Sequence, residues 1–287
     1  MAILYVVATP IGNLQDWSPR AVETLRNADL IAAEDTRVTG KLCQAFGIRT
    51  PLTSCHQHNE SGKGEYLADK MAAEDLKVAL TTDAGTPCVS DPGYGLVRAC
   101  ADRGIEVQPV PGCCAAVAAL SVSGFNTREF AFYGFLPREK KELREKLKEI
   151  SGGVRAAVIH ESPFRVTDLV EAIAETLPGA ELSVSCDLTK LHEKTLRGSP
   201  EDVLAALREN PKTEKGEYCL VLDLHGTEKP RPAETAAPVS LEARIADEMI
   251  RNGLSLRDAQ NELILNGEKK NAVKQAALNL KKLFANE

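Results

Sequence analysis

The 287-residue chain lacks any long apolar run, and no stretch approaches the roughly 18 apolar residues of a membrane-spanning helix. Its first apolar run, residues 3–8, is too short for a signal peptide and is followed by Thr9 and Pro10, so we expect a strand there. An excess of positive charge is also missing, since the formal net charge is −6. This balance argues against a globally basic nucleic-acid binder and leaves a local basic patch open.

Patterns that bind metals or form disulfides are scarce as well. The eight cysteines contain no CxxC pair, which is typical of free thiols in a reducing cytoplasm. His56 and His58 are one residue apart in a polar stretch, but no thiolate or third histidine accompanies them at a spacing that suits zinc. We therefore expect a cytoplasmic protein with no membrane-bound part and no metal site.

The usual phosphate-binding loops are absent too. The first predicted strand is followed by residues 9–13, which carry a single glycine instead of GxGxxG, and no GK[ST] occurs there. The loops 9–13, 83–91 and 111–114 contain no lysine or arginine. A crevice that they surround suits a neutral or cationic ligand better than a triphosphate, so a nucleotide hydrolase is the least favoured function.

What is present in the first 122 residues is an alternation of short aliphatic runs and helical patterns. Strands are predicted at 3–8, 30–33, 76–81 and 105–109, and helices at 18–27, 38–46, 65–74, 92–103 and 113–121. This α/β alternation predicts a parallel sheet with helices on both faces. Because the carboxyl ends of parallel strands share one edge, the loops that follow them should surround one crevice.

The rest of the chain has two further parts. Residues 123–226 are predicted to form a second, mixed α/β domain, with strands at 130–135, 154–160, 181–186 and 217–224 and helices at 163–176 and 201–209. The proline-rich stretch 227–239 is predicted to be a linker. Residues 240–287 show three helical patterns, which predict a helix-turn-helix-like module. The module contains eight Lys and Arg and seven Asp and Glu, so its net charge is close to zero. Its charge therefore does not distinguish RNA binding from a purely structural or dimerising role.

The most informative stretch is LTTDAGTPCVSDPG, residues 80–93. It follows a predicted buried strand and is so rich in glycine and proline that neither a strand nor a helix can continue through it. We expect the carboxylate of Asp83 to accept hydrogen bonds from a ribose or an amine of a ligand, and Asp91 to cap the next helix. An ordinary tight turn between a strand and a helix explains the same residues. The choice between a ligand-binding loop and such a turn therefore depends on the other motifs of the chain.

Seven motifs occur in order: TPIGNLQD, AEDTR, CHQHNE, TTDAGTPCVSDPG, VPG, HESPFR and LTKLHE. Together they resemble the tetrapyrrole methylase superfamily, the class III S-adenosylmethionine-dependent methyltransferases, over nearly the whole chain. Within it, the chain is most similar to members that methylate the ribose 2′-oxygen of a cytidine in the decoding centre of 16S rRNA. The resemblance implies a cofactor cleft between two α/β domains, 16S rRNA or the 30S subunit as substrate, and a homodimer.

The resemblance also implies site residues. Those expected to bind the cofactor are Pro10, Asp83, Ala84, Gly85, Asp91, Cys113, Cys114, His160, Glu161 and Cys219. Lys190 and Glu193 are candidates for orienting or deprotonating the acceptor hydroxyl, which is a poor acid. The chain departs from the family at Cys113-Cys114, where Pro-Ser or a similar pair usually follows Pro-Gly, and at Cys186-Asp187, where Arg-Glu is more common.

RNA recognition requires basic side chains, and the segment 137–148 has six Lys and Arg against three Glu. The candidate RNA-contacting residues of the chain are Arg37, His56, His58, Asn59, Arg138, Lys140, Lys141, Arg144, Lys269, Lys270 and Lys274. A solvated amphipathic helix explains the first segment equally well, and hydrogen bonds that stabilise loops explain the cluster around Arg37 and His56.

Two other functions stay open at this point. One is methylation of a corrin or porphyrin by another member of the same superfamily. The other is a non-catalytic RNA-binding factor for ribosome assembly that has kept the cleft, which predicts RNA binding without turnover of the cofactor.

Overall fold

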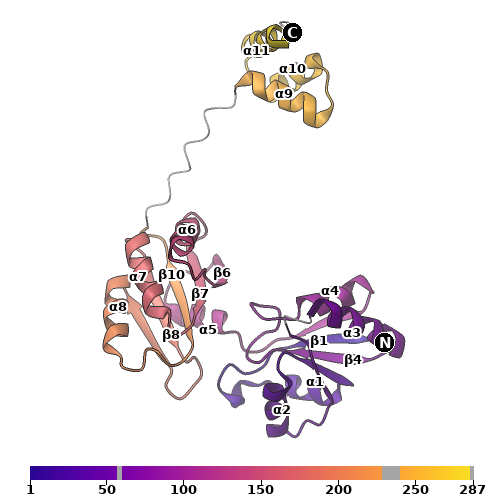
Figure 1. The fold of residues 1–287 in the computed structure, drawn as a ribbon, viewed down its shortest axis with the longest axis vertical. Helices are drawn as coiled ribbons and strands as arrows, with labels where there is room; N and C mark the ends of the chain where they lie inside the picture. The colour runs from indigo at the N-terminus through magenta and orange to yellow at the C-terminus, as the bar shows by residue number, and fades with distance from the viewer. Residues whose placement is uncertain (57–59, 228–239, 285–287) are drawn as a thin grey trace. The chain divides into compact units, whose positions relative to one another are not determined.

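The computed structural model describes residues 1–56, 60–227 and 240–284 of the chain. The chain divides into two compact units, Met1–Lys229 and Pro230–Glu287. The first unit contains two five-stranded sheets, and the second consists of helices (Figure 1).

The first sheet has the order β3-β2-β4-β1-β5, and all its strand pairs are parallel, which confirms the predicted parallel sheet. Its strands are β1 (Ile3–Val7), β2 (Leu30–Ala33), β3 (Leu52–Ser54), β4 (Lys77–Thr81) and β5 (Glu106–Val110). The intervening helices are η1 (Leu14–Asp16), α1 (Pro19–Asn27), α2 (Thr36–Ala45), α3 (Glu60–Glu74) and α4 (Tyr94–Asp102). Strand β3 was not predicted from the sequence, because three residues are too few to show a pattern.

Helices cover both faces of this sheet, as predicted. Along β4, Val78 and Leu80 pack into a core shared with α3 and α4, whereas Ala79 between them joins the core under α1 and α2. Successive residues of a strand point to opposite faces, so one continuous apolar strand supplies both cores. Figure 1 shows α3 and α4 on one side of the sheet and α1 on the other.

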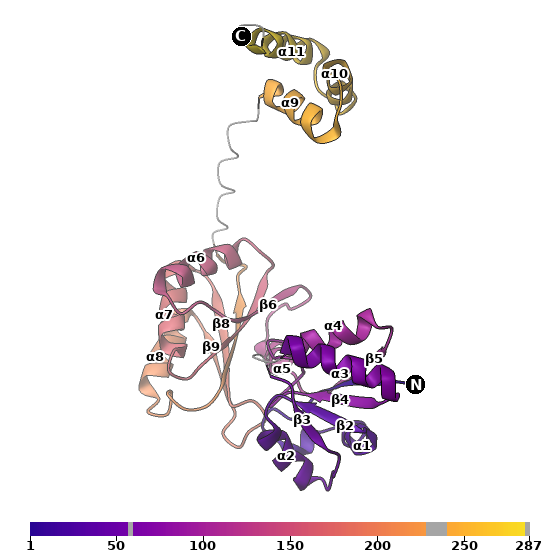
Figure 2. The same ribbon diagram turned by 45° about the vertical axis from the view of Figure 1, so that its right-hand side comes forward.

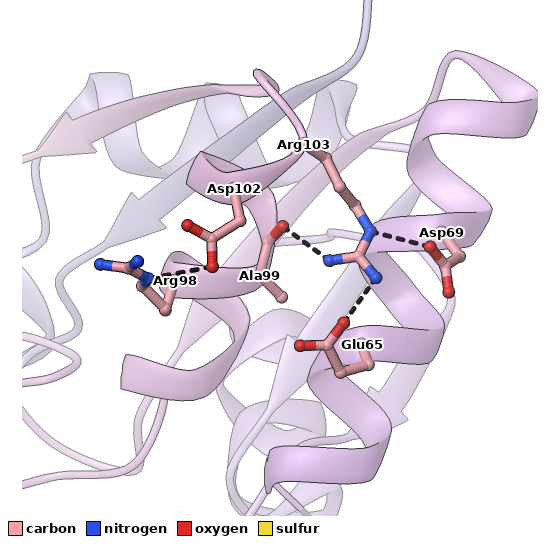
Figure 3. Close-up of polar contacts among 6 residues, drawn as sticks. All are labelled: Glu65, Asp69, Arg98, Ala99, Asp102 and Arg103. Carbon is pink, nitrogen blue, oxygen red and sulfur yellow. Dashed lines mark hydrogen bonds and ion pairs between the residues drawn. The ribbon is translucent and has the colours of Figure 1, made fainter.

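A branched ion pair joins α3 to α4 (Figure 3). Arg103 donates from Nε to Asp69 at 2.8 Å and from Nη2 to Glu65 at 2.5 Å, and its Nη1 binds the carbonyl oxygen of Ala99 at 3.0 Å. The guanidinium therefore satisfies acceptors on two helices and at the end of its own helix at once. The loop 82–93 ends where α4 begins. The contacts of Arg103 therefore also help to fix the position of that end of the loop.

We expect Arg103→Ala to lower the Tm of the protein more than Arg98→Ala does. Arg98 makes a single ion pair with Asp102, four residues along the same helix, at 2.9 Å, and exposed pairs of that kind contribute little. Arg103 links two helices that are far apart in the sequence, so its loss affects their packing. Thermal unfolding followed by circular dichroism measures the difference, and equal Tm values for the two variants would contradict it.

The start of α4 differs from the prediction. Its N-cap is Gly93, with a φ of 126°, and not Asp91. A Cβ at Gly93 would lie 2.7 Å from Cδ2 of Leu80, so the chain passes the core at this point too closely for any side chain. The carboxyl group of Asp91 is therefore not used as a helix cap.

The second sheet has the order β6-β7-β10-β8-β9, in which only β6 and β7 are parallel neighbours, so the mixed α/β domain is confirmed. Its strands are β6 (Phe130–Phe135), β7 (Ala156–Glu161), β8 (Glu181–Cys186), β9 (Lys194–Gly198) and β10 (Tyr218–Asp223). Its helices are α5 (Ala115–Ser123), α6 (Lys140–Ser151), α7 (Val166–Thr176) and α8 (Pro200–Glu209). The sequence did not predict β9. Ser199 caps α8: its Oγ accepts a hydrogen bond from the backbone amide of Asp202 at 3.1 Å, and its hydroxyl donates to the Asp202 carboxylate at 2.8 Å.

Helix α5 was predicted to belong to the first domain, but it packs on the second sheet. Its Ala119 and Leu120 share a core with Val158 of β7 and with Cys219 and Val221 of β10. The opposite face of the same strands packs against α6, α7 and α8. Helix α5 therefore covers the face of the second sheet that α6, α7 and α8 leave uncovered.

The second unit is a bundle of α9 (Leu241–Asn252), α10 (Leu256–Leu265) and α11 (Lys270–Phe284), as the three helical patterns predicted. Its core is separate from the others and includes Ile245, Leu263 and Val273. The predicted linker lies, apart from Thr227, outside the described residues. Figure 2 shows α9, α10 and α11 of this unit from a second direction. Among the described helices, none has the length and apolar character needed to cross a membrane.

Candidate functional site

The loops after β1, β4 and β5 are joined by hydrogen bonds at the carboxyl edge of the first sheet. The backbone amide of Thr9 donates to Gly85 at 2.8 Å, and that of Gly85 donates back to Thr9 at 3.1 Å. The hydroxyl of Thr86 donates to the carbonyl oxygen of Cys113 at 2.9 Å. The three loops therefore meet at one place, as the parallel topology predicted.

A cavity of about 370 Å³ lies beside these loops. One part of its wall comes from the loops and α5, and the other comes from the second sheet, through β6, β7, β10 and the turn after β8. Five residues that the sequence analysis assigned to the cofactor line it: Ala84, Asp91, His160, Glu161 and Cys219.

The other five residues predicted to bind the cofactor are in the same loops but are not part of the cavity wall: Pro10, Asp83, Gly85, Cys113 and Cys114. Pro10 is buried and directly precedes the wall residue Ile11 in the sequence. The thiol of Cys113 lies 3.6 Å from the carbonyl oxygen of Asp16. A direct cofactor contact by these five residues stays a prediction.

Carboxylates gather behind the loop 82–93. Glu34 accepts a hydrogen bond from the hydroxyl of Thr82 at 2.5 Å, and Asp83 accepts one from the backbone amide of Asp35 at 3.1 Å. Burial, followed by the charge of Glu34, raises the pKa of Asp83. Burial together with the charges of Glu34 and Asp83 raises the pKa of Asp91 to about 6. A cation close to Asp91 would relieve this repulsion.

The charged residues of the cavity wall are all acidic. They are Asp91, Glu161 and Glu217, and the wall contains no lysine or arginine. Glu161 is almost completely buried, and its Oε2 lies 3.3 Å from the guanidinium of Arg165 without a hydrogen-bond partner among the described residues. Glu161 thus forms an ion pair with Arg165, and Glu217 forms one with Lys190, whereas Asp91 has no ion-pair partner among the described residues. The carboxylate of Asp91 therefore favours a positively charged ligand.

His160 supplies a polar atom that the described residues leave unused. Its Nε2 is buried and has no hydrogen-bond partner in the part of the chain that the structure describes. Burial lowers the pKa of His160, with an opposing contribution from Glu217, so the imidazole is neutral at physiological pH. A neutral imidazole can donate or accept one hydrogen bond, which suits a hydroxyl group or a ring nitrogen of a ligand.

Lys190 lies at the edge of the cavity and is not part of its wall. Its ammonium group binds Asp187 and the wall residue Glu217, both at 2.9 Å. Burial lowers the pKa of Lys190, but the two carboxylates outweigh this effect and the net shift is upward. A raised pKa favours the protonated amine, so these contacts favour an orienting role for Lys190 over that of a proton acceptor.

The stem of Lys190 also crosses the first loop. A Cβ at Gly12 would lie 2.5 Å from Cγ of Lys190, so the two residues approach each other as closely as a glycine allows. The turn that carries Lys190 has Thr189 at a φ of 67° and is held by Glu193, whose carboxylate accepts the amide of Thr189 at 2.6 Å. Glu193 is exposed and lies outside the cavity wall, so the structure gives it a local contact and its catalytic role stays a prediction.

The candidate RNA-contacting residues differ in whether they are already paired. Arg37 pairs with Asp35 and Arg144 with Glu175, both at 2.6 Å. His56 is partly buried. The exposed candidates are Arg138, Lys140 and Lys141 beside or on α6 and Lys269, Lys270 and Lys274 beside or on α11. His58 and Asn59 lie outside the described residues.

Sequence analysis missed two wall residues that matter for the chemistry, Glu217 and Phe135. Glu217 lies two residues before Cys219, at the same phase of the alternation that places Cys219 on this face. A period of two would have found it. Phe135 ends β6 and follows an irregularity in that strand, so the alternation by itself predicts the wrong face for it.

Within the described residues, no group of three or more His, Cys, Asp or Glu side chains is placed to hold a metal ion. The site therefore consists of a carboxylate-lined cavity, a neutral histidine at its wall and a protonated lysine at its edge.

Comparison with known proteins gives matches along most of the chain. The protein named ribosomal RNA small subunit methyltransferase I of Synechocystis sp. is 43% identical over 265 residues, which cover 92% of each chain. The protein of the same name from Haemophilus influenzae is 40% identical over 279 residues, covering 96% of each chain, and that of Halalkalibacterium halodurans is 46% identical over 231 residues, covering 80% and 78%.

Solved structures share the fold at low identity. A diphthine synthase matches with a TM-score of 0.60 at 14% identity, covering 77% of this chain and 89% of its own. A uroporphyrin-III C-methyl transferase from Thermus thermophilus complexed with S-adenyl homocysteine matches with a TM-score of 0.53 at 16% identity, covering 77% and 96%. Residues 3–204 match the family Tetrapyrrole (Corrin/Porphyrin) Methylases, and the chain therefore belongs to the tetrapyrrole methylase family.

Proposed function

We propose that the chain transfers a methyl group from S-adenosylmethionine to the ribose 2′-hydroxyl of a cytidine in the decoding centre of 16S rRNA. The names of relatives that are 40–46% identical support methylation of small-subunit rRNA. The structural observation that supports the donor is the cavity wall, which contains no lysine or arginine and in which the Asp91 carboxylate has no ion-pair partner among the described residues. A sulfonium is a cation, and such a wall suits it.

The residues of the cavity fit this donor. Asp91 provides negative charge for the sulfonium, and Nε2 of His160, which has no hydrogen-bond partner among the described residues, provides a partner for a ribose hydroxyl or an adenine nitrogen. The same fold binds S-adenyl homocysteine in the uroporphyrin-III C-methyl transferase from Thermus thermophilus. When bound, the donor supplies an activated methyl group, and the task of the protein is to align it with the acceptor oxygen.

Lys190 is the residue that we assign to the acceptor. Its ammonium is held between Asp187 and Glu217, and a positive charge beside the ribose 2′-hydroxyl would lower the pKa of that hydroxyl and so favour loss of its proton to water. The oxygen would then form its bond to the methyl carbon as the bond from that carbon to sulfur breaks, with S-adenosylhomocysteine as the leaving group. Fixed charges of this kind need no rearrangement during the reaction, which is why they lower the barrier.

Contacts with RNA are assigned to the exposed basic residues. Arg138, Lys140 and Lys141 lie in the first unit, and Lys269, Lys270 and Lys274 lie in the second. Such side chains bind phosphates and position the RNA without reading its sequence. The homodimer and the cytoplasmic location stay predictions from the sequence.

The test of the proposal uses 30S subunits from cells that lack the protein. Incubation with S-adenosylmethionine should add one ribose methyl group to a cytidine of 16S rRNA, mapped by mass spectrometry. Uroporphyrinogen III in a parallel reaction tests the corrin or porphyrin alternative, and methylation of that compound instead would contradict the proposal. RNA binding without turnover of the donor would favour the non-catalytic assembly factor.

Deletion of residues 230–287 should leave the affinity for S-adenosylmethionine unchanged within about twofold and raise the KM for 30S subunits about tenfold. The physical reason is that the second unit has its own core and carries exposed lysines, whereas the residues that line the cavity all belong to the first unit's own loops and sheets. Calorimetry and methylation kinetics measure the two quantities. An unchanged KM would limit the second unit to a structural role.

A further inference from the structure

Strand β6 contains one extra residue just before it reaches the cavity. Phe130, Ala131 and Phe132 pair in register with 156–158 of β7, but the next partner of His160 is Phe135 and not Gly134. Gly134 has a φ of 60°, and a Cβ there would lie 2.7 Å from Oγ of Ser90. Glycine is therefore required at this bulge, which is formed against the loop 82–93.

The bulge changes which side chain faces the cavity. In regular alternation the position opposite His160, on the same face as Phe132, would belong to Gly134. With the extra residue it belongs to Phe135, whose ring centroid lies 5.8 Å from that of His160 with the planes at 73°. Phe132 packs edge-on against the same imidazole at 5.0 Å. The bulge thus places a large aromatic ring at a point where a regular strand has none.

This ring is unusual among the aromatic residues near the cavity because it is mostly open. Phe135 is 61% exposed although it belongs to the cavity wall, whereas Tyr218, which also lines the wall, is 4% exposed. An exposed ring costs free energy of hydration, which a planar ligand would recover by covering it. His160 and the bulge hold the ring from one side, so its open face is preorganised to receive that ligand.

Two planar groups take part in the proposed reaction, the adenine of the donor and the base of the acceptor nucleotide. A donor that is held inside the protein requires buried walls, and the buried polar atoms of His160 and Glu161 suit it. The exposed face of Phe135 suits a base that arrives from outside, in the way that single-stranded bases stack on aromatic side chains. The exposure of the ring therefore favours the acceptor.

We propose that Phe135 is the platform on which the base of the acceptor nucleotide stacks while its ribose is presented to the methyl donor. This inference rests on the proposed function, because it assumes an RNA acceptor. It assigns to the β6 bulge the task of turning the ring toward the cavity.

The experiment compares Phe135→Ala, Phe135→Leu and Phe135→Tyr with Phe130→Ala. Phe130 is the matched control, since it lies on the same strand, is 46% exposed and is not part of the cavity wall. Methylation of 30S subunits that lack the modification gives kcat and KM, and calorimetry gives the affinity for S-adenosylmethionine.

We expect Phe135→Ala and Phe135→Leu to lower kcat/KM for 30S subunits about tenfold, because loss of one base–aromatic stack has an effect of this size. Phe135→Tyr, which keeps the ring, should stay within about threefold of the wild type, and Phe130→Ala should match it. The affinity for S-adenosylmethionine should change by less than about twofold in all four variants, which also shows that they are folded.

Three results would overturn the platform. A loss of affinity for S-adenosylmethionine in Phe135→Ala would mean that the ring holds the donor. Unchanged kinetics would mean that the ring contacts nothing in the reaction. An equal loss in Phe130→Ala would mean that the whole strand serves a subunit interface. If the wild type itself fails to methylate 30S subunits, the proposed function falls and the platform falls with it.

Discussion

Replacing Lys190 with alanine should lower kcat for methylation of 30S subunits by about 100-fold to 1,000-fold, the range seen when one fixed donor that stabilises an oxyanion is removed. The affinity for S-adenosylmethionine should stay within about threefold, because Lys190 is not part of the cavity wall. Its ammonium instead lies between Asp187 and Glu217 at the edge of that wall. Single-turnover methylation kinetics and calorimetry measure the two effects separately.

Two controls decide whether the charge and position of Lys190 matter. Lys190→Arg keeps the charge and should recover part of the lost rate, whereas Glu193→Ala removes an exposed carboxylate of the same turn and should cost far less. Gly12→Ala leaves the ammonium intact but places a methyl group 2.5 Å from Cγ of Lys190, so it should lower kcat by displacing the side chain. Full activity of Lys190→Ala would remove this residue from the reaction.

Replacing Asp91 with asparagine should affect donor binding and stability in opposite directions. A carboxylate that faces a sulfonium in a half-buried site contributes about 2 kcal/mol, so we expect the affinity for S-adenosylmethionine to fall about 30-fold at pH 7.5. The same substitution removes a charge that burial, Glu34 and Asp83 disfavour. The folded protein without ligand should therefore become more stable, with a rise in Tm of a few degrees.

The pH dependence of the Asp91 variant follows from its raised pKa. The pKa of Asp91 is about 6 in the folded protein against 3.8 as the ordinary value, so between these pH values the folded state binds more protons than the unfolded state. The contribution of Asp91 to stability therefore falls as the pH rises through this window, so the advantage of the variant should grow across it and be complete above about pH 6. At pH 4 the two proteins should unfold at nearly the same temperature.

The measurements for Asp91 are thermal unfolding and donor affinity between pH 4 and 8. In the wild type the affinity should fall as the pH drops below about 6, and in Asp91→Asn this step should be absent. Glu145→Gln, which changes an exposed carboxylate of α6 outside the cavity, is the matched control and should show neither effect. Equal affinity of the wild type and the Asp91 variant at pH 7.5 would contradict a role in binding the sulfonium.

Most of the fold could be predicted from local patterns, and the errors have a common cause. The strands in the middle of each sheet, such as β4 and β10, are continuous apolar runs because both their faces are buried. The two strands that sequence analysis missed, β3 and β9, are edge strands of their sheets. Edge strands are short or partly polar because one side faces solvent, so no clear period marks them.

The candidate site shows the same division. Ala84, Asp91, His160 and Cys219 were assigned to the cofactor through the resemblance to the family, and they line the cavity. Ala84 and Asp91 also belong to a loop that follows a recognisable buried strand. One expectation about this loop was wrong, namely that Asp91 is the N-cap of α4. The N-cap is Gly93, where the chain passes too close to Leu80 to leave room for a side chain. Contacts of this kind between distant residues leave no local signal in the sequence.

The sequence by itself determined most of the strand and helix order of the α/β lobes, without β3 and β9, together with the three loops that share one edge and the acidic residues near them, because alternation, turn chemistry and charge are local properties. Only the tertiary structure decided what these groups do together. It packed α5 on the second sheet, turned Phe135 into the cavity through a bulge and fixed the protonated state of Lys190 between two carboxylates. Each of these depends on distances between residues far apart in the chain, which no local pattern encodes.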